Sequence, residues 1–401
     1  MTMDTELPQL PFPRPNVLDI APGYKPLRDR APLVRVRTAL GDDVWLATGY
    51  HICKQVFGDA RLGRSHPDPG NAARVSASLM FGGPTGDFAT EEQLHRTQRK
   101  VLTPAFSARR MRQLKDHVTE LSASMLDELA QRRPPVDLHA HFSFPLPNTV
   151  ICQLIGVPEP DRDSFRLWSG RFTSNDQADA AQAVGEMLGY TMGMVADRRK
   201  SPQDDLVSDL IAIAAAENLE LLTDHEIADM ALHLVFGGHE STVSRIDFGT
   251  LLLLRHPEQR KALVDDPSLV EQAVEEILRR SIPVDDLFPR YAREDFEIEG
   301  VTLRKGDCVL TSTSVANMDD RTFADPERFD IFRKPDASHA SFGHGMHYCV
   351  GNALARIELQ VVFSMLFQRF PTLELAVPFE ELHIPIERRW IGGLDELPVT
   401  W

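Results

Sequence analysis

The chain has 401 residues, of which 42% are hydrophobic and 25% are charged. This mix is that of an ordinary globular protein and excludes a disordered, collagen-like or disulfide-stapled chain. The 59 acidic residues outnumber the 43 basic ones and give a formal net charge of −16, which repels the phosphate backbones of nucleic acids. We therefore expect a folded, soluble protein that binds neither DNA nor RNA.

The beginning of the chain and the cysteines indicate where the protein acts. Residues 1–16 are rich in proline and lack the basic and apolar regions of a signal peptide. No run of about 18 apolar residues occurs, so no membrane span is expected. The four cysteines are scattered without paired spacing, which fits a reducing compartment. We expect a cytoplasmic protein with no membrane partner.

Segments with apolar residues at helical spacing dominate the sequence. In chain order they are 110–131, 145–156, 180–198, 204–216, 225–255, 257–263, 268–280 and 352–370. Strand-like alternation is confined to 33–37 with 43–47, to 295–311 and to 373–400. No repeat or flexible linker divides the chain. The sequence therefore predicts one mainly α domain over residues 1–401 with a small β lobe.

Two stretches stand out from this regular pattern. Residues 62–92 are rich in glycine and proline with little periodicity, and a long irregular loop of this kind is usually a binding element or a lid. Residues 342–351, FGHGMHYCVG, come directly before the last predicted helix. The glycines of this second stretch allow a tight turn, and Cys349 lies just before a helix start, where the dipole and free N–H groups favour a thiolate. Such a thiolate is a good ligand for iron.

The stretch 342–351 resembles the haem-binding loop F-G-x-G-x-H-x-C-x-G of the cytochrome P-450 family, and every fixed position is matched. Glu276 and Arg279 resemble the family's E-x-x-R pair, and Arg328 resembles the arginine of its P-E-R-F stretch. The resemblance implies that these three residues are structural, forming a buried network that holds the loop under the haem. It also implies the cytochrome P-450 fold, with haem b between the long helix 225–255 and the helix that follows the Cys loop.

The resemblance further implies which residues bind the cofactor. Cys349 is expected to be the axial ligand of the iron. Four cations at the family's positions are expected to bind the two propionates, which need cationic partners when partly buried: His95, Arg99, Arg290 and His347. The remaining expected haem contacts are Gly238, Phe342, Gly343 and Gly351.

Residues 236–242, FGGHEST, resemble the family's [A/G]-G-x-[D/E]-T motif on the long helix. Glycine inside a helix costs about 1 kcal/mol relative to alanine, so the glycine pair indicates close approach to a ligand. The resemblance implies that Glu240 and Ser241 are the catalytic proton relay. Serine replaces the usual threonine here, which keeps the hydroxyl but loses the methyl group that restricts its rotamer. His239 is expected to face away from the haem.

In the family, the substrate pocket is lined by the 62–92 loop, by helical cover at 165–195 and by segments near the haem. The candidate substrate contacts are Leu79, Met80, Phe81, His233, Phe236, Asp286, Phe288 and Ile391. A buried carboxylate at Asp286 would favour a cationic or N–H-rich ligand.

The implied function is that of a monooxygenase, which activates dioxygen at the haem iron and hydroxylates or epoxidises a small natural product in secondary-metabolite biosynthesis. Electrons would come from NAD(P)H through a separate ferredoxin and ferredoxin reductase. Three alternatives remain. They are oxidative C–C or C–N coupling of aromatic or diketopiperazine substrates, a non-catalytic haem-binding protein, and a zinc protein that uses His344, His347 and Cys349.

Overall fold

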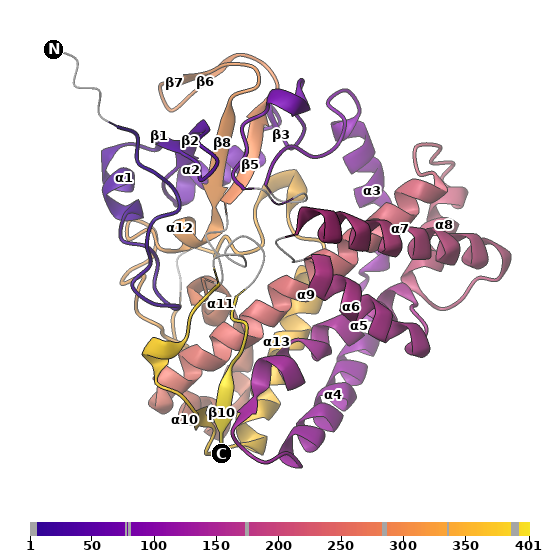
Figure 1. Cartoon of the computed structure of the whole chain (residues 1–401), viewed down its shortest axis with the longest axis vertical. Helices are drawn as coiled ribbons and strands as arrows, with labels where there is room; N and C mark the ends of the chain where they lie inside the picture. Colours follow the sequence, from indigo (N-terminus) through magenta and orange to yellow (C-terminus); the bar gives the residue numbers. More distant parts are fainter. Residues whose placement is uncertain are drawn as a thin grey trace. The chain divides into compact units, whose positions relative to one another are not determined.

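The computed structural model describes residues 6–76, 78, 82–172, 176–282, 287–334, 337–385 and 393–401. The chain divides into two compact units, one made of residues 1–92 and 275–349 and the other of 93–274 and 350–401. Each unit therefore joins segments that are far apart in the sequence. Figure 1 labels the helices and strands of both units, which are described here one at a time.

The first unit contains a five-stranded sheet with strand order β1-β2-β8-β5-β3. Its strands are β1 (Leu33–Arg37), β2 (Asp43–Ala47), β3 (Leu62–Gly63), β5 (Leu287–Ala292) and β8 (Cys308–Ser312). β1 and β2 form the predicted antiparallel hairpin with the predicted bounds, β2 pairs with β8 in parallel, and β5 runs antiparallel to both β8 and β3. A separate hairpin joins β6 (Phe296–Ile298) to β7 (Val301–Leu303).

Short helices complete the first unit. They are α1 (Tyr24–Arg30), α2 (Tyr50–Gly58) and α12 (Thr313–Asn317). The apolar face of α2, with Ile52, Cys53 and Val56, lies in one buried cluster with Leu33 of β1 and Val309 of β8. The burial of this face against the sheet holds a helix that is too short to be stable alone.

The second unit is helical. Its helices are α4 (Ala108–Ala130), α5 (Pro145–Ile155), α6 (Arg162–Phe172), α7 (Gln177–Lys200), α8 (Leu206–Ala216), α9 (Asp224–Arg255), α10 (Pro257–Asp265) and α13 (Asn352–Arg369). Strands β4 (Val136–Asp137), β10 (Pro398–Thr400) and β9 (Glu374–Leu375) form a small antiparallel sheet. α3 (Glu91–Ala105) and α11 (Val270–Arg280) each contain a point where the chain passes from one unit to the other.

The longest helix, α9, is the centre of the second unit and contacts α5, α7, α8 and α13 (Figure 1). Its first turn is capped by Thr223, whose hydroxyl accepts a hydrogen bond from the Glu226 backbone N–H at 3.2 Å. Asp224 and Glu226 lie at the positive end of the helix dipole. The helix ends before Pro257, which begins α10.

Most predicted elements are confirmed, and the chain is mainly α with small sheets. The structure corrects the C-terminal prediction: within the described part of 373–400, only Glu374–Leu375 and Pro398–Thr400 are strands. β5 was not predicted. Among the described residues, no helix is both long and apolar enough to cross a membrane.

Candidate active site

Cys349 lies at the end of a tight loop in the first unit. The backbone N–H of Cys349 donates to the carbonyl of Phe342 at 3.0 Å and closes the loop. Between these residues, Gly345–His347 form one turn of 3₁₀ helix. This closure presents the cysteine three residues before the first residue of α13.

Two glycines are required by the path of this loop. Gly343 and Gly345 both have φ of +72°, a left-handed conformation that other residues seldom adopt. A Cβ on Gly345 would lie 2.8 Å from both the Cα of Gly58 and the carbonyl oxygen of Phe57. The loop therefore approaches α2 closely enough to exclude any side chain at this position.

Cys349 is the accessible cysteine of the chain, because Cys53, Cys152 and Cys308 are buried. Burial raises the pKa of the Cys152 thiol to about 12 and also raises the pKa of Cys308. Thiols in such surroundings stay protonated and unreactive. Cys349 is therefore the cysteine available to bind a metal.

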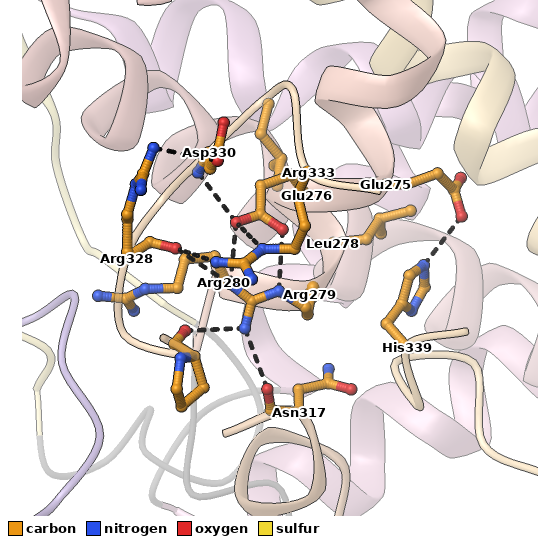
Figure 2. A network of polar contacts seen from close by, with 12 residues as sticks. Glu275, Glu276, Leu278, Arg279, Arg280, Asn317, Arg328, Asp330, Arg333 and His339 are labelled. Carbon is orange, nitrogen blue, oxygen red and sulfur yellow. Dashed lines mark hydrogen bonds and ion pairs between the residues drawn. The ribbon is translucent and has the colours of Figure 1, made fainter. Parts of the chain in front are cut away.

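Glu276 and Arg279 form a buried, two-pronged ion pair on α11. Nε and Nη2 of Arg279 each donate to a different carboxylate oxygen of Glu276 at 2.8 Å. Nη1 also donates to the carbonyls of Asn317 at 3.0 Å and Pro326 at 2.8 Å. Figure 2 shows that the pair connects α11 to two other segments of the first unit.

Asn317 carries this connection to the Cys loop. Its Oδ1 accepts a hydrogen bond from the Ala340 backbone N–H at 2.6 Å, and its Nδ2 donates to the Ser341 hydroxyl at 2.9 Å. Ser341 in turn donates to the carbonyl of Leu278 on α11 at 2.6 Å. The residues immediately before Phe342 are thus fixed to α11. Sequence reasoning missed Asn317, since no local pattern marks it.

The structure corrects the expected role of Arg328. Its guanidinium is 67% exposed and pairs with Asp330 at 3.2 Å, so only its backbone carbonyl reaches the buried network. Arg333 takes the expected place, with Nε 3.2 Å from the Glu276 carboxylate (Figure 2). Arg333 also donates to carbonyls of the loop that it closes, including that of Asp325 at 3.0 Å. The loop turns between the two arginines and directs the second one inward.

One stripe of α9 is open, although most of the helix is buried. His233, Gly237 and Ser241, spaced four residues apart on one face, are exposed. A Cβ added to Gly237 would meet nothing within 4 Å, whereas one added to Gly238 would lie 3.2 Å from Ile151 on α5. The first glycine therefore leaves open space along this stripe, and the second allows α9 to approach α5.

The two expected relay residues lie at this point of α9. The Ser241 hydroxyl donates to the carbonyl of Gly237 at 2.6 Å, and the Glu240 side chain is buried. His239 is buried on the other side, as expected, and its Nε2 lies 3.1 Å from the Phe144 carbonyl. Because a carbonyl can only accept, Nε2 must carry a proton.

The expected propionate ligands come from three elements. His95 and Arg99 lie four residues apart on one face of α3, His347 lies in the Cys loop, and Arg290 lies on β5. Arg290 is 7% exposed, and its Nε is buried without a hydrogen-bond partner among the described residues. A buried guanidinium with an unused donor is well satisfied by an anion, so Arg290 fits a haem that carries carboxylates.

The expected substrate contacts divide into two groups. His233 is on the open stripe of α9, Phe236 is buried, and Phe288 on β5 is 37% exposed and lies against Phe57. His233 Nδ1 also lies 2.8 Å from the Asp229 carbonyl of its own helix. The remaining expected contacts lie outside the described residues: Leu79, Met80, Phe81, Asp286 and Ile391.

Comparison with known proteins gives the class of the molecule. The family model described as cytochrome P450 matches residues 162–380. Pentalenolactone synthase of Streptomyces exfoliatus is 42% identical, over 99% of this chain and all of that protein. Mycinamicin IV hydroxylase/epoxidase of Micromonospora griseorubida is 38% identical, over 98% of each chain. The substrate-free structure of a cytochrome P450 that epoxidises the polyene macrolide pimaricin superposes with a TM-score of 0.87 at 37% identity, covering 98% of this chain and 99% of that one.

The chain belongs to the cytochrome P450 family and has its fold. It is therefore an oxidoreductase of the haem-thiolate class, which takes its electrons from NAD(P)H through redox partners. This membership sets aside the zinc alternative for Cys349.

Proposed function

We propose that this protein is a monooxygenase that hydroxylates or epoxidises a secondary metabolite. The relatives named above support this substrate class, since their names refer to pentalenolactone, mycinamicin IV and pimaricin. The observation that carries the proposal is the open stripe of α9, on which the Ser241 hydroxyl is exposed, while the preceding residue, Glu240, has a buried side chain. A hydroxyl on an open helix face that directly follows a buried acid is suited to passing a proton to a bound group.

The chain's own residues supply an iron ligand, a proton relay and space for the reacting group. Cys349 binds iron as a thiolate, and the haem so bound supplies the reductive activation of dioxygen. Glu240 holds a proton, and the Ser241 hydroxyl passes it on by exchanging its hydrogen bond to the Gly237 carbonyl for one to the reacting group. The open space at Gly237 leaves room for that group.

The haem is held by cations and by glycines. In the proposal His95, Arg99, Arg290 and His347 bind the propionates, while Phe342, Gly343 and Gly351 lie against the macrocycle. Gly238, the glycine expected from the sequence to contact the haem, faces Ile151 on α5, so Gly237 takes that place on the open stripe. Glu276 and Arg279 act only through the Cys loop, which they fix through Asn317 and Ser341.

Electrons must enter from another protein in this proposal. An iron–sulfur cluster held by protein thiolates needs four cysteines, and three of the four in this chain are buried at separate places. A small ferredoxin with its reductase is the partner that fits.

The first test is the absorption spectrum of the reduced protein with carbon monoxide, for the wild type and for Cys349→Ala. A strongly red-shifted Soret band that disappears in the variant is the expected result, because a thiolate ligand causes that shift. Cys152→Ala, which removes a buried thiol, is the matched control and must keep the band. A wild-type protein without the band, or a band retained in Cys349→Ala, would contradict the proposal.

The mass of the product tests the reaction type. With ¹⁸O-labelled dioxygen, hydroxylation or epoxidation adds one labelled oxygen to the substrate. Loss of hydrogen with the mass of a dimer or adduct would instead indicate oxidative coupling, and the absence of any turnover would favour a non-catalytic haem protein.

A further inference from the structure

Strand pairing in the first unit brings the backbones of two arginines, Arg64 and Arg290, close to each other. In the antiparallel pair of β3 and β5, Leu62 lies opposite Ala292 and Gly63 lies opposite Tyr291. β3 ends at Gly63, so Arg64 directly follows the last paired residue of β3, and Arg290 directly precedes its partner Tyr291 on β5. The backbones of the two arginines therefore lie beside the same end of this strand pair.

A carboxylate beside this strand pair, Glu91, is already engaged by other donors. Glu91 accepts hydrogen bonds from the backbone N–H groups of Arg64 at 2.6 Å and Ser65 at 3.1 Å, and from the Ser65 hydroxyl. It also forms an ion pair with Arg293 at 2.9 Å. A Cβ on Gly63 would lie 2.6 Å from this carboxylate, so Glu91 packs directly against Gly63. Glu91 thus neutralises Arg293.

The face of β5 that carries Arg290 also carries Phe288, and Val309 and Thr311 of β8 lie opposite these two residues. Arg290 is 7% exposed, and its guanidinium lies 5.3 Å from the centre of the Phe57 ring. Phe57 also lies 6.2 Å from Phe288, two residues before Arg290 on the same face of β5. Nη1 of Arg290 donates only to the carbonyl of Pro289 at 2.9 Å, and its Nε has no partner among the described residues.

The charges support the same geometry. Burial lowers the pKa of Arg290 to about 9, and the neighbouring Arg64 guanidinium contributes to this decrease. Burial also lowers the pKa of Arg64, although the nearby Glu91 opposes the change. Like charges close together in a buried site are destabilising, so these two cations are at their most stable when an anion lies against them.

We propose that Arg64, together with Arg290, binds a carboxylate, and that this carboxylate is a propionate of the haem. The inference rests on the proposed function, because it takes the haem as the ligand. It adds Arg64 to the four cations expected from the sequence. Two neighbouring guanidinium groups can each donate charge-assisted hydrogen bonds to a carboxylate oxygen, and such bonds are stronger than those between neutral groups.

The test is the rate at which the ferric protein loses haem to an excess of apomyoglobin. We expect Arg64→Gln to lose haem about tenfold faster than the wild type, since a hydrogen bond to a charged group is lost. Arg64→Lys should recover part of the difference. Arg61→Gln is the matched control: Arg61 is on the same segment but pairs with Asp59 at 2.6 Å and stacks on Phe296. It should lose haem at the wild-type rate.

Haem dimethyl ester identifies the source of the carboxylate. Both propionates are esterified in this compound, so the wild type and Arg64→Gln reconstituted with it should lose it equally fast. If Arg64→Gln retains natural haem as well as the wild type does, the propionate assignment is overturned. A Soret titration with dodecanoate that is weaker in Arg64→Gln would then assign the carboxylate to a substrate. Equal titrations, or none in either protein, would overturn the proposal altogether.

This inference and the proposed function can fail separately. Arg64→Gln must show the same carbon monoxide spectrum as the wild type, because Cys349 is unchanged. If the wild type lacks the thiolate spectrum, the proposed function fails. If that spectrum is present and haem loss, esterified or not, is insensitive to Arg64, only the inference fails.

Discussion

At the scale of single residues, the serine at the position of the family's threonine is the departure with the clearest chemical consequence. Ser241 keeps the hydroxyl that its position requires, and this hydroxyl donates a hydrogen bond to the Gly237 carbonyl at 2.6 Å. A serine turns about χ1 more freely than a threonine, because it lacks the branching methyl group. The hydroxyl is therefore present but less strictly held, which affects how reliably protons are delivered rather than whether haem is bound.

Ser241→Ala should uncouple the enzyme. We expect product formed per NAD(P)H to fall by about tenfold or more, with peroxide released instead, because a positioned proton donor typically contributes 10²–10⁴-fold. Ser241→Thr should couple at least as well as the wild type. Ser244→Ala is the matched control, since the Ser244 hydroxyl makes the same kind of bond, to the Glu240 carbonyl at 2.9 Å, on a buried face. Unchanged coupling in Ser241→Ala would remove the residue from the relay.

At the scale of elements, α11 acts as the anchor of the Cys loop. Its Glu276 carboxylate receives Arg279, Arg333 and the Asp330 backbone N–H at 3.0 Å, so a buried negative charge is fully surrounded by donors (Figure 2). Breaking such a buried cluster costs far more than breaking a surface ion pair, because the remaining charge is left without a partner. Arg328 and Arg333 lie in the same loop, but only the side chain of Arg333 contacts Glu276.

Arg333→Gln should destabilise the holoprotein by about 2 kcal/mol, and Arg328→Gln by about 0.5 kcal/mol or less. The Arg333 side chain is 12% exposed and bonded to Glu276, whereas the Arg328 side chain is 67% exposed. Thermal unfolding of the two variants, with haem loading measured in parallel, makes the comparison. A larger loss of stability in Arg328→Gln than in Arg333→Gln would show that the family's arginine position, and not the observed contact, carries the stabilisation.

These elements show which features local sequence can predict. α9 and the Cys loop were found because apolar spacing and the glycine patterns act within a few residues. β5 was missed because Pro289 and Arg290 interrupt its alternation, and it is held instead by pairing with β8 and β3. The inward turn of Arg333 and the position of Arg64 beside the end of the β3–β5 pair depend on contacts between distant segments. The proposed haem ligands that belong to a local motif could therefore be named from the sequence, and Arg64 could not.

At the scale of the whole molecule, charge is distributed unevenly. The chain has a net charge of −16, yet residues 96–115 contain seven basic and no acidic residues. Some of these cations are paired within the second unit, such as Arg110 with Asp209 at 2.7 Å. Arg109, Arg112 and Lys115 are exposed on α4. An exposed basic group on an acidic protein attracts an acidic partner and raises its rate of association.

Reversing one of these charges should weaken the interaction with the electron donor. If an acidic ferredoxin docks on this part of α4, Arg112→Glu should raise the ferredoxin KM several-fold, while the carbon monoxide spectrum and haem loss remain those of the wild type. The difference should shrink as ionic strength rises, because salt screens exposed charges. Arg133→Glu makes the same change of charge just beyond the end of α4, about 30 Å along the helix direction, and serves as the control. Equal KM values for the two variants would mean that net charge alone matters, and that the ferredoxin docks elsewhere.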